Sequence, residues 1–449
     1  MSSGDGVSPD GPLARKGKGL LALVRSNLAF RSRWAEVNGA MGDLGTYVPI
    51  IMALSLAKGL DLGTTLIFTG VYNVLTGALY GVPMPVQPMK SIAAVAISSG
   101  PDEFGVPEIM AAGICTSAVV FLLGVTGLMG IVYNYIPLPV VRGVQLAQGL
   151  SFSLTAVRYV RNEQNLAKGK SLDQRPWLGS DGLVLAMICV CFILIVNGAG
   201  ENGGSGEDED LGRPEGRSGR SRVWKILTSL PSAVIVFLLG VVLAVIREPS
   251  AVRGFTLGPS TVHVVRISRH AWKEGFLRGA VPQIPLSVLN SVVAVCRLSH
   301  DLFPEKTQEV SATSVSVTVG LMNLVGCWFG AMPSCHGAGG LAGQYKFGGR
   351  GGGCVAALGM GKLLVGVLLG GSLLRLLAAF PVGLLGVLLL FAGLELAACC
   401  RDMTGKEESL VVLTCAAVSL VGSSAALGFA CGLAAHLLLS IRKAIGKRL

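Results

Sequence analysis

Charged residues are scarce in this 449-residue chain. Only 14% of residues are charged, 51% are hydrophobic, and mean hydropathy is +0.63. A water-soluble chain of this length needs more charge to cover its surface, so this composition excludes an ordinary soluble protein and indicates a bilayer as solvent. Leu62–Met89, Ile109–Val141 and Ser409–Ile441 contain no Asp, Glu, Lys or Arg. About 20 apolar residues cross a membrane as helix, so these and shorter runs predict about 10 to 14 crossings.

Paired cysteines and clusters of metal ligands are also missing. The 11 cysteines lie mostly singly in apolar stretches, with no Cys-x-x-Cys pair. The five histidines are scattered and no acidic ligand cluster accompanies them. This pattern excludes a disulfide framework and a zinc site, and it offers no nucleophile set for an enzyme. We therefore expect a protein that is not an enzyme, with no metal and no cofactor.

Basic residues are in excess, giving a net charge of +11, but they flank the apolar spans. This placement favours a lipid bilayer as partner over nucleic acid. Basic residues before the first span and after the last one predict that both termini are cytoplasmic and that the number of crossings is even. The basic stretches 158–175 and 247–269 make the bias less clean. We expect the plasma membrane, with the mitochondrial or vacuolar membrane as alternatives. Residues 14–33 are basic and faintly amphipathic, which is the reason for the mitochondrial alternative.

Polar stretches divide the chain into parts. We predict six parts: a disordered basic tail over 1–33, a first transmembrane repeat over 34–197, a flexible charged loop over 198–222, the last segment of that repeat over 223–248, a second transmembrane repeat over 249–441, and a short basic tail over 442–449.

An internal repeat relates the two halves. Residues 81–90 read Gly-Val-Pro-Met-Pro-Val-Gln-Pro-Met-Lys, and residues 330–339 read Gly-Ala-Met-Pro-Ser-Cys-His-Gly-Ala-Gly. An asparagine precedes each stretch, Asn73 in the first half and Asn323 in the second, and we expect both to hydrogen-bond between helices. Paired Pro/Gly-broken segments are the usual sequence sign of a carrier that holds substrate at the membrane midplane.

The chemistry of the two breaks indicates an anion site. Val82–Pro88 is too rich in proline for a helix, so we expect it to be extended and a helix to open at residues 89–91. In the second half we expect residues 334–339 to open the facing helix. Each helix N-terminus carries about half a positive charge. With Lys90, two such termini supply about +2, which a small tetrahedral dianion would balance.

Candidate residues follow from this picture. The substrate-binding candidates are Gln87, Met89, Lys90, Ser91, Ser334, Cys335, His336, Gly337 and Ala338. Thr46, Gln283 and Asn290 are candidates for a second set of contacts. Each has a structural alternative: Lys90 can snorkel, the two serines can cap helices, His336 can be a packing residue, the glutamines can be structural, and the glycines can serve close packing.

Acidic residues in a membrane span are costly unless they are paired or protonated, which makes them functional candidates. Importing a dianion against 100 mV, negative inside, costs about 4.6 kcal/mol at about 2.3 kcal/mol per charge. Co-transported protons would offset that cost. Asp43, Glu36 and His336 are the candidate proton carriers.

Three motifs are specific enough to indicate a family: Pro-Val-Gln-Pro-Met-Lys-Ser at 85–91, Met-Pro-Ser-Cys-His-Gly-Ala-Gly-Gly-Leu-Ala-Gly-Gln-Tyr at 332–345, and the stretch 35–47. With them, residues 34–441 resemble the molybdate transporters of plants and algae, a branch related to the sulfate permeases. Sulfate permeases proper carry a regulatory domain after the membrane part, and only residues 442–449 follow the last apolar run here.

The resemblance implies an all-α polytopic membrane protein of two inverted repeats of about seven segments. It implies core and gate domains, broken helices at the midplane, high-affinity molybdate transport by alternating access, and a homodimer. The residues themselves indicate only a small oxyanion, so a sulfate or general oxyanion carrier remains an alternative. A nucleobase-type permease would share the architecture, but it would have less use for Lys90 between two helix N-termini.

Overall fold

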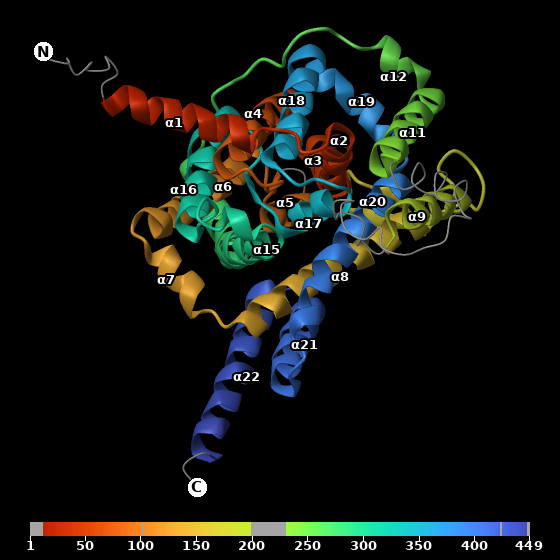
Figure 1. Ribbon diagram of the computed structural model, residues 1–449. Helices are drawn as coiled ribbons and strands as arrows, with labels where there is room; N and C mark the ends of the chain where they lie inside the picture. Colours follow the sequence, from red (N-terminus) through yellow and green to blue (C-terminus); the bar gives the residue numbers. More distant parts are fainter. Residues whose placement is uncertain (1–11, 101–102, 199–229, 423, 447–449) are drawn as a thin grey trace, which may run out of the picture.

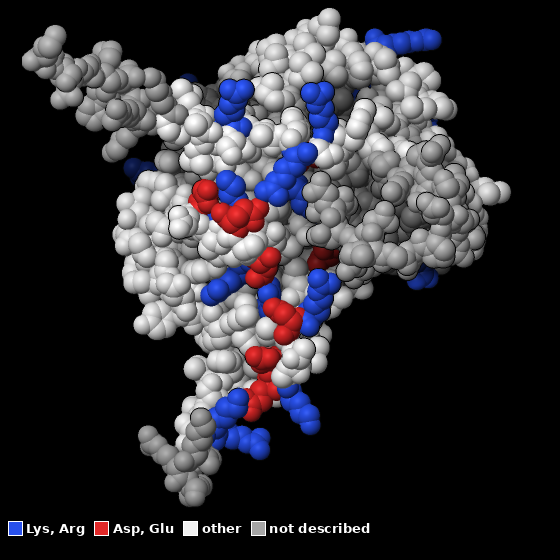
Figure 2. All heavy atoms as spheres, in the orientation of Figure 1, with Lys and Arg blue, Asp and Glu red and all other residues white. Residues whose placement is uncertain are grey.

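The computed structural model describes residues 12–100, 103–198, 230–422 and 424–446, and it is helical almost throughout (Figure 1). Within these residues eight helices are long and apolar enough to cross a membrane, and two shorter apolar helices accompany them. On the face in Figure 2, acidic and basic side chains gather in a band that runs down the molecule, and broad areas beside it carry no charge. The chain is an integral membrane protein.

The first half supplies seven segments of the helical framework within the described residues. In order they are α2–α3 (Arg33–Ala40 and Leu44–Lys58, joined by a 3-10 turn), α4 (Leu62–Tyr80), β1–α5 (Val86–Pro88 and Lys90–Ser98), α6 (Val106–Val125), α8 (Leu138–Arg161), α9 (Leu183–Asn197) and α11 (Ser232–Arg247). The connections contain α7 (Leu128–Tyr135), the hairpin β2–β3 (Asn162–Asn165 and Lys170–Gln174) and α12 (Pro249–Arg253).

The second half supplies seven more in the part of the chain that the structure describes. They are α13–α15 (Arg269–Glu274, Val281–Leu286 and Val295–Leu302, linked by π-helical turns), α16 (Ala312–Gly326), β4–α17 (Ser334–His336 and Ala338–Lys346), α18 (Gly352–Leu369) with the short α19 (Leu373–Ala378), α20 (Val382–Ala397), α21 (Lys406–Val421) and α22 (Ala425–Gly446). The π-helical turns adjoin Pro285, whose missing N–H interrupts the regular helix ladder.

The two halves meet at the centre in an antiparallel pair of short strands. Val86 lies opposite His336, Gln87 opposite Cys335, and Pro88 opposite Ser334. Each strand leads directly into a helix, β1 into α5 and β4 into α17. Because corresponding strands of the two halves run in opposite directions, the halves are inverted relative to each other. The prediction of two inverted repeats with broken central helices is therefore confirmed.

The helices form two bodies. In the core body α4 packs on α18 and α6 on α16, around the two strands. In the gate body α8 packs on α20, and α9, α11, α21 and α22 join them, extending to the right and below in Figure 1. Glycines allow the close gate pairing, since a Cβ at Gly149 would lie 2.5 Å from the Ala397 nitrogen and one at Gly393 2.7 Å from the Ser153 hydroxyl oxygen.

Part of the tail predicted over residues 1–33 is helical among the described residues. Helix α1 spans Pro12–Asn27, and α2 begins at Arg33. The end of α1 is anchored because Asn27 is buried and donates to the carbonyl of Ala78 at the end of α4 (2.9 Å). Helix α22 likewise continues through residue 446 into the predicted C-terminal tail. The predicted loop 198–222 lies outside the described residues, except Gly198, and the domain bounds remain predictions.

Candidate anion site between two helix N-termini

Two asparagines at corresponding positions hold the central strands. The Asn73 side-chain oxygen accepts from the Val86 backbone N–H (2.8 Å). The Asn323 oxygen accepts from the Ser334 N–H (2.6 Å), and its amide nitrogen donates to the Ser334 carbonyl (2.6 Å). Our prediction that these residues bond helix to helix is wrong, because their side chains satisfy strand backbone that would otherwise be unpaired in the interior.

Helices α5 and α17 begin directly after the two central strands. Helix α5 begins at Lys90 with Met89 as its N-cap, as expected. The expected opening over residues 334–339 is correct only for the last part of that range, because residues 334–336 are strand and α17 begins at Ala338 with Gly337 as N-cap. The Met89 N–H donates to the carbonyl of Pro333 (2.9 Å), which adds one more hydrogen bond between the two halves beside the strand pair. The first turns of both helices therefore lie at the same central crossing.

A small cavity lies at this crossing, with a volume of about 10 Å³, and it is lined by Gln87, Pro88, Lys90, Gln283, Leu286, Asn290, Ser291, Cys335 and Gly337. Six of these are substrate or second-contact candidates predicted from the sequence. The volume is about that of one water probe, so an oxyanion requires the walls to separate. The structure thus holds the site in a contracted form.

The Lys90 ammonium is buried and has no hydrogen-bond partner among the described residues. Its nitrogen lies 3.7 Å from the ring centroid of Phe152, which belongs to gate helix α8. Burial excludes the snorkelling alternative. An aromatic face stabilises a cation only partly, so this ammonium retains its capacity to bind an anion.

Polar contacts fix the other walls of the cavity. Gln87 donates from Nε2 to the Asp43 carboxylate (2.5 Å), and Gln283 accepts from the Ser91 N–H (2.9 Å). The Ser291 hydroxyl donates to the Cys335 sulfur (3.0 Å). The Asn290 side-chain oxygen is buried without a partner among the described residues. Gln87 therefore keeps Oε1 without a partner among the described residues, whereas the Gln283 amide is fully engaged because its nitrogen also donates to the Ser287 hydroxyl (2.9 Å).

Some predicted residues lie off the cavity. The Ser334 hydroxyl donates to the Met332 carbonyl (2.9 Å). His336 is buried one position along β4 from Cys335, and it meets the Tyr80 ring edge-on, with centroids 6.1 Å apart. Because strand residues alternate faces, His336 points away from the side on which Cys335 lines the cavity. Ala338 is fully buried in the first turn of α17.

The acidic candidates occupy different places. Glu36 is buried beside the α17–α18 connection and accepts from the Arg350 N–H (3.2 Å), so it lies outside the cavity lining. Asp43 is fully buried, and its second oxygen lies 3.6 Å from the ammonium of Lys362 on α18. The Thr46 hydroxyl is buried in α3. Lys362 was missed by the sequence analysis, although a lysine within an apolar run was the signal that could have found it.

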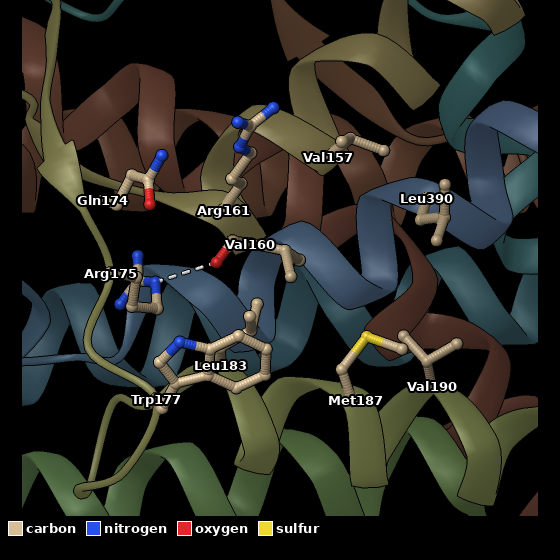
Figure 3. Close-up of a pocket in the computed structure, with 10 residues that line it drawn as sticks. All are labelled: Val157, Val160, Arg161, Gln174, Arg175, Trp177, Leu183, Met187, Val190 and Leu390. Atoms are coloured by element: carbon tan, nitrogen blue, oxygen red, sulfur yellow. Dashed lines mark hydrogen bonds between the residues drawn. The ribbon is translucent and has the colours of Figure 1, made fainter.

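Larger cavities lie elsewhere and differ in character. One of about 470 Å³ lies between α8, α9 and α20, lined mainly by apolar side chains such as Leu183, Met187 and Leu390 (Figure 3). Its buried cation, Arg175, is engaged with backbone carbonyls including that of Val160 (3.1 Å). This cavity lacks the converging free polar groups of the central site, so its size does not make it the anion site.

The chain is similar in sequence to known membrane transporters. The model of a family described as "Molybdate transporter of MFS superfamily" matches residues 35–152 and 275–396. "Molybdate transporter 1" of Arabidopsis thaliana is 63% identical over 414 residues, 92% of this chain and 90% of that protein. "Molybdate transporter 2" of the same plant is 58% identical over 91% of this chain and 88% of its own length. "Molybdate transporter 1" of Chlamydomonas reinhardtii is 35% identical over 89% and 90%.

Two solved structures share the fold. The murine Solute Carrier 26 family member A9 anion transporter, inward-facing, has a TM-score of 0.58 at 15% identity and covers 99% of this chain and 74% of its own. The transmembrane domain of the cyanobacterial bicarbonate transporter BicA has a TM-score of 0.52 at 13% identity, with 90% and 98% covered. The predictions of a membrane transporter and not an enzyme are confirmed. On the family match and the long alignments, this chain belongs to the molybdate transporter family.

Proposed function

We propose that this protein carries molybdate across a membrane by alternating access, with the dianion held between the N-termini of α5 and α17 and beside Lys90. The observation that supports this most is the convergence of both helix starts and the unpaired Lys90 ammonium on one cavity. Each N-terminus contributes about half a positive charge and free N–H donors. With the ammonium, the site offers about +2, the charge of one tetrahedral dianion.

Binding would require the gate body to withdraw. Phe152 of α8 contacts the Lys90 ammonium, and it packs with Leu389 of α20. A Cβ at Gly339 would lie 2.0 Å from the Phe152 ring, so the gate aromatic also presses on the first turn of α17. Substrate would take the place of Phe152 at the ammonium, and core and gate would then slide past each other to open the site on the opposite side.

We further propose that protons accompany the dianion. His336 is the carrier best placed among the three candidates, because neither ring nitrogen has a hydrogen-bond partner among the described residues. Asp43 already faces Lys362 and Gln87, and Glu36 accepts from backbone N–H groups. Uptake should therefore fall as external pH rises and under a proton ionophore, and His336→Gln should remove that dependence. An unchanged pH response in folded His336→Gln would exclude this assignment.

We further propose a homodimer, as the resemblance to the family implies, and helix α22 is the element on which we would test it. Several of its large apolar side chains are about half exposed or more, including Leu427, Leu437, Leu438 and Ile441, and Figure 1 shows it projecting from the body with α21. Cross-linking of cysteines placed on α22 in native membranes tests this, and a uniformly monomeric product would exclude it. We place the protein in the plasma membrane, which a fluorescent fusion viewed beside mitochondrial and vacuolar markers would check.

The substrate is tested by uptake of labelled molybdate at nanomolar concentration in cells that lack their own carrier. We expect saturable uptake that persists in excess sulfate. Uptake that sulfate abolishes would favour a general oxyanion carrier. No molybdate uptake, with transport of an uncharged base instead, would favour the nucleobase-type alternative.

A further inference from the structure

A second lysine lies behind the anion site and outside the cavity lining. Lys362, on α18, has a side chain only 5% exposed, and its nitrogen lies 3.6 Å from Asp43 Oδ2. The same ammonium lies 3.4 Å from the ring centroid of Tyr47. Asp43 itself is fully buried. A lysine and an aspartate this deep in a membrane protein are costly unless each neutralises the other.

Asp43 connects this pair to the substrate cavity. Its other oxygen accepts the Gln87 amide at 2.5 Å, and Gln87 is part of the cavity wall. Helix α17 closes over this contact at Gly340, where a Cβ would lie 2.4 Å from Gln87 Nε2 and 2.9 Å from Asp43 Oδ1. Lys362, Asp43 and Gln87 therefore form a continuous row from α18 to the cavity.

The row matters for the charge that a substrate experiences. The two helix N-termini contribute about one positive charge between them, and Lys90 contributes a second. Asp43, one side chain behind the wall, would cancel one of these. Lys362 offsets Asp43 and leaves the site at about +2, whereas without it the site would suit a monoanion. Charge interactions at such short range in the interior are weakly screened.

We propose that Lys362 is a specificity-determining residue: by neutralising Asp43, it lets Asp43 position Gln87 while the site keeps its preference for dianions over monoanions. This inference rests on the proposed function, since it assumes that the central cavity binds the anion. It assigns Asp43 a positioning role, through Gln87, in place of proton transfer. Lys362 does not touch the substrate.

The test compares molybdate with perrhenate, a tetrahedral monoanion, as ligands of the purified full-length protein. We expect Lys362→Met to lower the affinity ratio of molybdate to perrhenate by about tenfold or more, the effect of removing one nearby charge. Asp43→Asn should raise the ratio, because it removes the opposing negative charge. The double variant, neutral at both positions, should return it to within about threefold of the wild-type value. A purely structural role would change stability without changing this ratio in opposite directions.

The chain offers a matched control. The side chain of Lys346 is likewise only 6% exposed, and its nitrogen lies 3.9 Å from the Glu395 carboxylate, away from the cavity lining. Lys346→Met should leave the ratio unchanged. If wild-type protein binds no molybdate, the transport proposal and this inference both fail. If it binds molybdate but Lys362→Met keeps the wild-type ratio, only this inference is overturned. Should Lys362→Met not fold, Asp43→Asn decides, and an unraised ratio there overturns the inference.

Discussion

A methyl group at Gly337 should disable the anion site without disturbing the backbone. A Cβ there would lie 1.8 Å from Gln87 Oε1 and 2.6 Å from Gln87 Cδ, far inside contact distance. Gly337 has φ −120° and ψ 122°, which alanine adopts freely, so the conflict lies entirely between side chains. Relief requires the Gln87 amide to withdraw from the cavity wall, and with it from Asp43.

The size of the affinity loss follows from the hydrogen bond that the Gln87 amide gives up when it withdraws. A hydrogen bond to a charged group contributes about 1.5–3 kcal/mol. If the conflict is relieved at the site, Gly337→Ala should weaken molybdate affinity about 10- to 150-fold at about 1.4 kcal/mol per tenfold. The loss should appear mainly in KM, because Gln87 forms the wall and the gate is unchanged.

The assay is concentration-dependent uptake of labelled molybdate, with size-exclusion profiles of a fluorescent fusion to confirm folding. Gly361→Ala is the matched control, because a Cβ at that helical glycine meets nothing within 4 Å. We expect wild-type KM for the control. A folded Gly337→Ala protein with wild-type KM would show that Gln87 does not form the binding wall as described.

Three further predictions follow from the contacts. Asn323→Ala removes three hydrogen bonds with backbone groups, whereas Asn73→Ala removes one, so at about 1 kcal/mol each it should lower the melting temperature more. The reverse order would contradict their role on the strands. Phe152→Leu frees the Lys90 ammonium from its aromatic contact and should tighten molybdate binding while slowing turnover; weaker binding would contradict competition at Lys90. Arg142 has a side chain only 6% exposed and forms ion pairs with Asp301 and Asp402. Arg142→Met should therefore destabilise the fold by about 2 kcal/mol in thermal unfolding, and an unchanged midpoint would contradict that role.

The central breaks could be predicted because their causes are local. The prolines of Val82–Pro88 forbid helix, and a lysine directly after uncharged residues marks a charge brought into the membrane. These two features were enough to place β1, the start of α5 and the half of the cavity that they form.

The remainder depends on contacts between distant residues. Ser334–His336 forms a strand because it pairs with β1, and the residues 334–336 alone do not predict this pairing. His336 leaves the cavity because strand alternation, once register is set, turns it to the other face. The pairing of Lys362 with Asp43 could not be predicted, because it depends on how α18 packs beside a residue from the other half of the sequence.

The central claim is that the oxyanion sits between the two helix N-termini. Electron cryomicroscopy of the full-length protein with tungstate, a heavier tetrahedral dianion, tests it directly. We predict one strong density within hydrogen-bond distance of the Lys90 ammonium and of the first-turn N–H groups of α17, with Phe152 moved away from Lys90. Density elsewhere, or an unoccupied central site in protein that transports molybdate, would contradict the account.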